Sequence, residues 1–176
     1  MSEEIAAAVR KRLRSIADHP QPGVMFADIT PVLADSKAFA LVVDHLVAGH
    51  IDSDIDKVAG IEARGFVLAA PVAYLLDAGL VPLRKEGKLP AEKVGVQYAL
   101  EYGTETLEMH SDAFEPGERV LLIDDVLATG GTSAAAIELI EGSGAVVVGL
   151  SFMIEISGLG GRESLSGRDV AALVQY

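Results

Sequence analysis

Apolar side chains recur at helical spacing in two segments near the start of the chain. Large apolar residues lie three or four positions apart over residues 2–17, and proline and glycine interrupt this pattern over 20–23. A second helix is expected from Ser36, as the N-cap, to about Ala48. The inward-facing side chains are Ile5, Val9, Leu13 and Ile16 in the first helix and Phe39, Val42, Val43 and Leu46 in the second.

From residue 57 onward, short apolar runs alternate with longer segments at helical spacing. The runs lack the alternation of a half-exposed strand, which is typical of strands buried on both faces. Residues 94–100 and 104–109 flank the turn at Glu101 to Gly103 and predict a hairpin. The other expected strands cover 57–61, 80–83, 119–123, 146–154 and 170–174, and the other expected helices cover 65–76 and 132–141.

This alternation of strands and helices predicts an α/β fold with a mostly parallel central sheet that is flanked by helices. The 176 residues contain no repeat, low-complexity tract or linker, which favours a single domain over residues 1–176. Ligands of such sheets bind beyond the carboxyl ends of the strands. Residues that follow strands are therefore the first candidates for a functional site.

Composition argues against several classes of protein. The formal net charge of -12 disfavours nucleic-acid binding, which depends on lysine and arginine. Because the chain has no cysteine, disulfides and thiolate metal sites are excluded. The uncharged run over 65–76 is too short to span a bilayer, and the charged N-terminal pattern lacks the apolar core of a signal peptide. We expect a cytoplasmic protein without nucleic-acid or membrane partners.

The stretch VLLIDDVLATGGT over residues 120–132 joins a predicted buried strand to the start of a helix. Asp124 and Asp125 come at the carboxyl end of the strand, where their carboxylates suit two neighbouring sugar hydroxyls and a divalent cation. The two glycines allow a tight turn that brings backbone N–H groups close to an anion, and the helix start adds further donors. The pattern predicts a phosphate cradle beside an acidic pair. The cradle residues are Ala128, Thr129, Gly130, Gly131 and Thr132.

Other interpretations of this stretch fit its residues less well. No lysine follows the glycines, so the loop is not a Walker loop, and the glycine spacing of a dinucleotide-binding loop is missing. A phosphatase-like metal site would need further acidic ligands. A surface acidic pair followed by an ordinary glycine turn stays open as the structural alternative.

Basic side chains gather at two places in this acidic chain. Arg84, Lys85 and Lys88 form a local cluster, and Arg64 stands between a predicted strand and a predicted helix. Both places would suit a polyanionic group, because a guanidinium can bind phosphate oxygens through two N–H donors. The alternatives are a solvated loop for the cluster and a surface helix cap for Arg64.

The stretch over residues 120–132 resembles the motif that binds phosphoribosyl pyrophosphate (PRPP) in the type I phosphoribosyltransferases. This resemblance implies the fold of that family, with a small hood made by the N-terminal and C-terminal segments. It also implies that Asp124 and Asp125 hold the ribose 2- and 3-hydroxyls and that residues 128–132 hold the 5-phosphate. Mg²⁺ is the implied cofactor, with Asp124 and Asp125 as its ligands.

Further segments resemble those of the adenine phosphoribosyltransferases within this family. They follow the order of the family from about Ile16 to the end of the chain. One departure is Ala27, where many relatives carry arginine or lysine. The segments are PQPGVMFADITP over 20–31, GIEARGF over 60–66, RKEGKLP over 84–90, LEYG over 100–103 and GRE over 161–163.

The resemblance implies a pocket for the purine base around Phe26. The ring of Phe26 would stack on the base, and the backbones of Met25 and Ala27 would bind its edge. Leu159 would line the same pocket. A core position is the alternative for Phe26, since a single phenylalanine is more often buried than used in binding.

The resemblance also implies residues for catalysis and for the pyrophosphate. Glu101 would assist removal of a proton from the base, and the alternative for Glu101 is a solvated carboxylate in a turn. Tyr102 would belong, with Glu101, to a mobile flap. A non-proline cis peptide bond would fall near Glu62 and Ala63 and would mark a ligand site, with Ala63 as a substrate-binding residue. The residues that would neutralise the pyrophosphate are Arg64, Arg84, Lys85 and Lys88.

The implied reaction joins adenine to the ribose 5-phosphate of PRPP and releases AMP and pyrophosphate. Transfer to hypoxanthine or guanine is the nearest alternative, because the sugar-phosphate motif does not select the base. A non-catalytic domain that senses PRPP or a nucleotide is an alternative of another class. The family also implies a homodimer, with exposed faces beside Arg64 and Phe66 available for contact.

Overall fold

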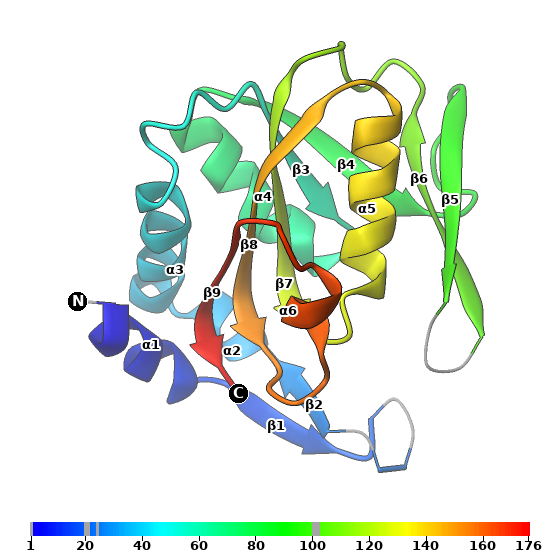
Figure 1. Ribbon diagram of the computed structural model, residues 1–176. Coiled ribbons are helices and arrows are strands. Elements are labelled where there is room, and N and C mark those ends of the chain that lie inside the picture. Colours follow the sequence, from blue (N-terminus) through cyan, green and yellow to red (C-terminus); the bar gives the residue numbers. More distant parts are fainter. Residues whose placement is uncertain (1, 20–21, 24, 100–102) are drawn as a thin grey trace.

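The computed structural model describes residues 2–19, 22–23, 25–99 and 103–176, and a seven-stranded sheet forms its centre (Figure 1). The strands of this sheet are β3 (Lys57–Ile61), β4 (Gly79–Lys85), β5 (Lys93–Ala99), β6 (Thr104–His110), β7 (Arg119–Leu127), β8 (Val146–Glu155) and β9 (Val170–Gln175). Their order is β5-β6-β4-β3-β7-β8-β9. Neighbours from β4 to β9 run parallel, whereas β5 and β6 form an antiparallel hairpin at one edge. The expected mostly parallel sheet is confirmed.

Helices cover both faces of the sheet and bury two apolar cores. The longer helices are α1 (Ser2–Arg10), α3 (Ser36–Ala48), α4 (Arg64–Leu75) and α5 (Gly131–Gly142). Leu122 packs with α5 on one face, whereas Leu121 and Ile123 pack with α3 and α4 on the other. This alternation explains why β7 is an unbroken apolar run. Within the described ranges, no helix is long and apolar enough to cross a membrane.

The prediction of one helix over residues 2–17 is wrong in its second half. Helix α1 ends at Arg10, and β1 (Arg14–Ala17) pairs antiparallel with β2 (Met25–Asp28). Ile16 is exposed in β1, so its helical spacing reflects no buried helix face. Pairing with β2 satisfies the backbone hydrogen-bonding groups of β1. Because β2 lies beyond the proline-containing segment, a local sequence pattern does not reveal this pairing.

A small hood lies beyond the carboxyl ends of β8 and β9, as expected (Figure 1). The N-terminal segment contributes the β1–β2 ribbon, and the C-terminal segment contributes the short helix α6 (Gly161–Ser164). The hydroxyls of Ser15 and Tyr176 are hydrogen-bonded, which connects the ribbon to the end of the chain.

The N-cap of α3 is Asp35 rather than the predicted Ser36. The Asp35 carboxylate accepts hydrogen bonds from the backbone N–H groups of Lys37 and Ala38 at 3.1 and 2.9 Å. These bonds satisfy two donors that the first turn of a helix leaves free. Serine and aspartate are both frequent N-caps, so the neighbouring pair did not reveal which residue takes the role.

Strand β7 extends beyond its predicted end at residue 123. It stays paired with β8 as far as Leu127, which lies opposite Glu155. Asp124 and Asp125 therefore lie inside the last part of the strand and do not follow it. The prediction also missed α2 (Thr30–Ala34), a short helix with proline in its first turn.

Candidate active site

The residues predicted to bind the sugar phosphate and the pyrophosphate come from three neighbouring parallel strands and the segments that follow them. The residues after β3 include Arg64, β4 leads into the basic cluster, and β7 carries Asp124 and Asp125 before the glycine loop. Because β4, β3 and β7 are adjacent and parallel, their carboxyl ends meet at one edge of the sheet. The fold thus brings together segments that are far apart in the sequence.

In the acidic pair, Asp125 is buried and Asp124 is half-buried, and the two carboxylates contact different neighbours. Asp125 is 5% exposed, and its Oδ2 lies 2.8 Å from Nε of Arg64. Oδ1 of Asp124 accepts a hydrogen bond from the backbone N–H of Asp125 at 2.9 Å. Gly65 permits this packing, because a Cβ at that position would lie 2.9 Å from Oδ1 of Asp124 and from the Ile123 carbonyl oxygen.

Burial raises the pKa of both carboxyls. For Asp124, the negative charge of Asp125 raises the pKa further. For Asp125, the positive charge of Arg64 offsets only part of the effect of burial, so the pKa stays above its usual value. Two adjacent buried carboxylates disfavour each other's charge, so a pair of hydroxyl donors or a cation would stabilise their ionised form.

The glycine loop has the conformation expected of a phosphate cradle. Gly130 has a φ of 86°, in the left-handed region that favours glycine, and it directly precedes α5. A cavity of about 70 Å³ lies at the loop, with Asp124 on its wall. The volume suits a group of the size of a phosphate. The other lining residues are Val126, Leu127, Ala128, Thr129, Gly130, Gly131, Thr132 and Ser133.

Helix α6 supports the cradle from behind. The Ser164 hydroxyl is within hydrogen-bond distance of the carbonyl oxygens of Thr129 at 3.0 Å and of Gly161 at 2.8 Å. A Cβ on Gly130 would overlap the Ser164 hydroxyl and lie 2.9 Å from the Gly161 carbonyl oxygen. The loop therefore requires glycine for its close contact with α6 as well as for its dihedral angle.

The carboxylate of Glu62 is the hydrogen-bond partner of most of the basic cluster. Glu62 accepts hydrogen bonds from Nε of Arg84 and the backbone N–H of Lys85, both at 2.9 Å, and from Nζ of Lys88. Burial alone would raise the pKa of Glu62, but hydrogen bonds from Lys88 and Arg84 outweigh it and lower the pKa to about 2. The Glu62–Ala63 peptide bond is cis, as expected.

The remaining cation of the cluster has a carboxylate partner of its own. Nζ of Lys85 donates to Oε1 of Glu105 in β6 at 2.8 Å. The sequence interpretation gave no role to Glu62 or Glu105, although Glu62 lies within the GIEARGF segment. Nothing in the local sequence singles out Glu105, because its contact with Lys85 arises from the sheet.

Phe26 lies beside Arg64 and does not belong to the buried core. The guanidinium carbon of Arg64 is 4.8 Å from the ring centroid of Phe26, and the ring of His19 meets Phe26 edge-on at 4.9 Å. Met25 is exposed, whereas the side chain of Ala27 is buried in one of the two apolar cores. Only the backbone of Ala27 remains available to a ligand.

Two predicted residues lie outside the described ranges, and one more lies at the edge of the hood. Glu101 and Tyr102 belong to the undescribed residues 100–102, so their roles stay predictions. The strands on either side pair in an antiparallel hairpin, with Ala99 opposite Thr104. Leu159 is exposed in the segment that leads to α6.

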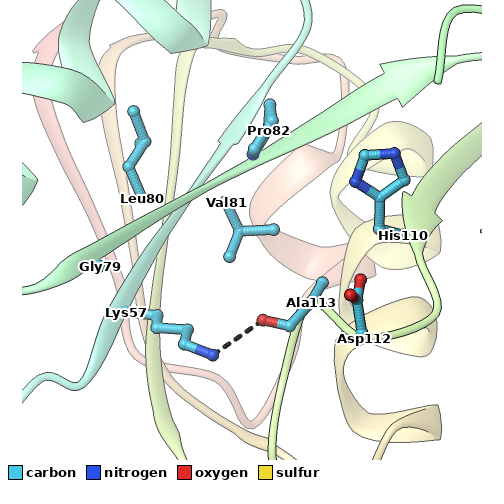
Figure 2. A pocket seen from close by; sticks show the side chains of 8 residues that line it. All are labelled: Lys57, Gly79, Leu80, Val81, Pro82, His110, Asp112 and Ala113. Carbon is cyan, nitrogen blue, oxygen red and sulfur yellow. Dashed lines mark hydrogen bonds between the residues drawn. The ribbon is translucent and has the colours of Figure 1, made fainter. Parts of the chain in front are cut away.

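A larger cavity lies at the other end of the sheet (Figure 2). It measures about 280 Å³, and its walls include Lys57 and Gly79, the first residues of β3 and β4. Nζ of Lys57 donates a hydrogen bond to the Ala113 carbonyl oxygen at 2.9 Å and forms an ion pair with Glu118 at 2.8 Å. No predicted site residue lines this cavity. The candidate site is therefore identified by the chemical groups that meet there and not by the size of its cavity.

Comparisons with known proteins agree with this geometry. Residues 32–159 match the phosphoribosyl transferase domain family. The adenine phosphoribosyltransferase of Acidothermus cellulolyticus is 57% identical over 98% of this chain and 97% of its own length. The crystal structure of the Rhodothermus marinus enzyme has a TM-score of 0.95 and 46% identity, and the alignment covers 99% of both chains.

A third relative has been solved with ligands. The Saccharomyces cerevisiae adenine phosphoribosyltransferase, complexed with adenine and an imino-altritol bisphosphate, has a TM-score of 0.90 and 34% identity. The alignment covers 97% of this chain and 99% of the yeast chain. The chain therefore belongs to the phosphoribosyltransferase family and, within it, to the adenine phosphoribosyltransferases.

Proposed function

We propose that this protein transfers the 5-phosphoribosyl group of PRPP to adenine, with AMP and pyrophosphate as products. The observation that carries the proposal is the meeting of three features at one edge of the sheet. These features are the acidic pair in β7, the glycine cradle at the start of α5 and the basic cluster at the end of β4. Together they match the sugar hydroxyls, the 5-phosphate and the pyrophosphate of one substrate.

In this proposal, the cradle and the acidic pair bind the sugar phosphate. The backbone N–H groups of residues 128–132 and the positive end of the α5 dipole hold the 5-phosphate. Asp124 and Asp125 accept hydrogen bonds from the two ribose hydroxyls. Charge-assisted bonds of this kind offset the unfavourable burial of the two carboxylates.

The basic cluster is proposed to bind the pyrophosphate by exchange of partners. Before PRPP binds, Arg84 and Lys88 are paired with Glu62, and Lys85 is paired with Glu105. These carboxylates hold the cations near one another, so that the cations need little reorganisation to meet a polyanion. The bond from the anomeric carbon to the pyrophosphate oxygen breaks, and its electron pair leaves with the pyrophosphate.

The base is proposed to bind beside Phe26 and to attack the anomeric carbon through a ring nitrogen. That nitrogen forms the new bond and loses its proton, for which Glu101 is the proposed acceptor. A backbone carbonyl facing position six accepts a hydrogen bond from the amino group of adenine and would oppose the oxo group of hypoxanthine or guanine. Because the Ala27 side chain is buried, selection rests on the backbone and on Phe26.

The acidic pair also fits Mg²⁺, which we propose as the cofactor. Oδ2 of Asp125 is buried and forms an ion pair with Arg64 but, among the described residues, no further hydrogen bond, and carboxylate oxygens are ligands that Mg²⁺ prefers. The described residues contain no group of three or more acidic or histidine side chains that could hold a metal. Substrate oxygens and water would complete the ligand set, and the cation would offset charge on the pyrophosphate.

We further propose that α4 forms the contact of a homodimer. Val67, Ala70 and Tyr74 lie on one face of α4 at helical spacing and are exposed, and Tyr74 is 85% exposed. Leu75 at the end of α4 and Leu80 in β4 are also exposed. Light scattering after gel filtration should give twice the chain mass, and Tyr74→Arg should shift it toward one chain. A monomeric wild-type protein at micromolar concentration would contradict the dimer.

The proposed reaction is tested by incubating the protein with Mg²⁺, PRPP and adenine and measuring AMP. The same assay with hypoxanthine and guanine tests the choice of base. Binding of PRPP or AMP without turnover would indicate a sensor instead of an enzyme. Comparable turnover with hypoxanthine or guanine would contradict adenine selectivity while leaving the transferase reaction intact.

A further inference from the structure

The segment GRE over residues 161–163 has no role in the proposed reaction, although it is one of the segments that resemble the family. It begins α6, the short helix of the hood, which lies beside the start of α5 (Figure 1). Gly161 is buried, and a Cβ on it would lie 2.3 Å from the Ala128 carbonyl oxygen. The helix therefore packs directly against the backbone of the proposed phosphate cradle.

Arg162 connects α6 to two strands of the central sheet. Its Nε donates to Oε1 and Oε2 of Glu155 at 3.0 and 3.2 Å, and its Nη2 donates to Oε2 at 2.7 Å. Its Nη1 donates to the Val170 carbonyl oxygen at 2.7 Å. Glu155 is the last residue of β8, and Val170 is the first residue of β9. Because all three nitrogens of the guanidinium have acceptors, the planar group is held in one orientation.

Glu155 is a well-placed partner for this guanidinium. Its side chain is only 12% exposed, and hydrogen bonds from Arg162 outweigh burial and keep the pKa of Glu155 below its usual value. The carboxylate is therefore charged at neutral pH. Glu155 also lies opposite Leu127 in the pairing of β7 with β8, and Leu127 directly precedes the glycine loop. The ion pair thus joins α6 to the part of the sheet from which the loop begins.

The far end of α6 contacts the loop as well. The Ser164 hydroxyl is within hydrogen-bond distance of the Thr129 carbonyl oxygen, at 3.0 Å. The next residue, Leu165, is 3% exposed and belongs to the apolar core on the α5 face of the sheet. Contacts therefore run without a break from Glu155 through Arg162 and the backbone of α6 to residues 128–130.

We infer that Arg162 is a positioning residue for the 5-phosphate site, because its forked contact with Glu155 holds α6 against the backbone of Ala128 and Thr129. The N–H groups of the loop are then fixed before the phosphate arrives, which lowers the cost of binding. The inference rests on the proposed function, because the 5-phosphate is assigned to residues 128–132 only there. Arg162 touches no substrate in this scheme.

The test measures affinity for AMP, which carries the 5-phosphate without a pyrophosphate. Arg162→Gln removes the charge and the forked contact. Calorimetry should show AMP affinity reduced about 3- to 10-fold, and the Michaelis constant for PRPP should rise by a similar factor and more than that for adenine. Arg162→Lys keeps the charge but cannot reach both carboxylate oxygens and the Val170 carbonyl oxygen at once. Its AMP affinity should therefore lie between those of Arg162→Gln and wild type.

The chain offers a matched control in the ion pair of Arg168 with Glu141. Both Nη atoms of Arg168 donate to the Glu141 carboxylate, which lies in the last turn of α5, at the opposite end of that helix from the loop. Arg168→Gln removes a forked contact of the same kind and should leave AMP affinity at the wild-type value. Melting temperatures check that both variants are folded.

A double variant tests whether the effect of Arg162 passes through α6. Ser164→Ala should itself weaken AMP binding, because it removes a contact between α6 and the loop. In the Ser164→Ala background, Arg162→Gln should cause a smaller loss of AMP affinity than it causes in the wild type. Glu155→Gln should reduce AMP affinity in the same direction as Arg162→Gln, since it removes the other half of the ion pair.

Several outcomes would overturn the inference. Wild-type AMP affinity in Arg162→Gln would remove the role of the ion pair, and an equal loss in Arg168→Gln would show a general effect of weakened ion pairs. Fully additive losses in the double variant would show that Arg162 does not act through α6. A wild-type protein that neither binds AMP nor consumes PRPP would instead contradict the proposed function.

Discussion

Replacement of Gly130 by alanine tests the phosphate cradle most directly. The left-handed conformation of residue 130 costs an alanine about 1–2 kcal/mol. The new methyl group would overlap the Ser164 hydroxyl and lie 2.9 Å from the Gly161 carbonyl oxygen. Moving Ser164 away breaks one or two hydrogen bonds, each worth about 0.5–1.5 kcal/mol. These effects sum to about 1.5–5 kcal/mol, and they act on the loop that is proposed to hold the phosphate.

We therefore expect Gly130→Ala to lose at least about tenfold in AMP affinity, since 1.4 kcal/mol corresponds to a factor of ten. The free energy of unfolding should fall by about 1.5–5 kcal/mol if the loop keeps its conformation. Isothermal calorimetry with AMP and chemical denaturation measure the two quantities. The PRPP dependence of the initial rate gives a third measure, which should weaken together with AMP binding.

Gly142→Ala provides the matched control at the other end of α5. A Cβ at Gly142 meets nothing within 4 Å, so this variant should bind AMP normally and be at least as stable as wild type. Ser164→Ala in the Gly130→Ala background should recover part of the loss, because it removes the overlapping hydroxyl. If Gly130→Ala bound AMP with wild-type affinity, the loop would not be the phosphate cradle.

Three other predictions test separate parts of the site. Asp125→Asn should reduce catalytic efficiency at limiting PRPP about tenfold or more, because a charge-assisted bond worth about 1.5–3 kcal/mol is weakened; unchanged efficiency would contradict its role. Phe26→Ala should raise the Michaelis constant for adenine more than that for PRPP, and the opposite order would place the base elsewhere. The pKa of Glu62 falls on folding from 4.5 to about 2, so Glu62 contributes stability above pH 4.5 that is lost as the pH falls toward 2. Denaturation curves of Glu62→Gln should show a weaker loss of stability over that window, and an unchanged slope would contradict the ion-pair interpretation.

Local sequence patterns were enough to predict the sheet and the tight glycine loop before α5. An apolar run such as the one that begins β7 predicts a buried strand by itself, because a strand buried on both faces needs apolar side chains at every position. Gly130 and Gly131 likewise predict a tight loop before a helix, because few other residues allow such a turn. The resemblance to the family then supplied the base pocket, which stays a prediction. It also supplied the cis peptide bond at Glu62, which the structure confirmed.

The partners of the charged and polar side chains were decided by the tertiary structure. Glu105 reaches Lys85 only because β6 pairs with β4, and Arg64 lies between Asp125 and Phe26 only because β2, α4 and β7 converge at one edge. The same cause explains the errors at β1 and at the end of β7, where a partner strand extends the pairing. Helical and strand periodicity arises from each residue's neighbours in sequence, whereas these contacts join segments that only the folded sheet brings together.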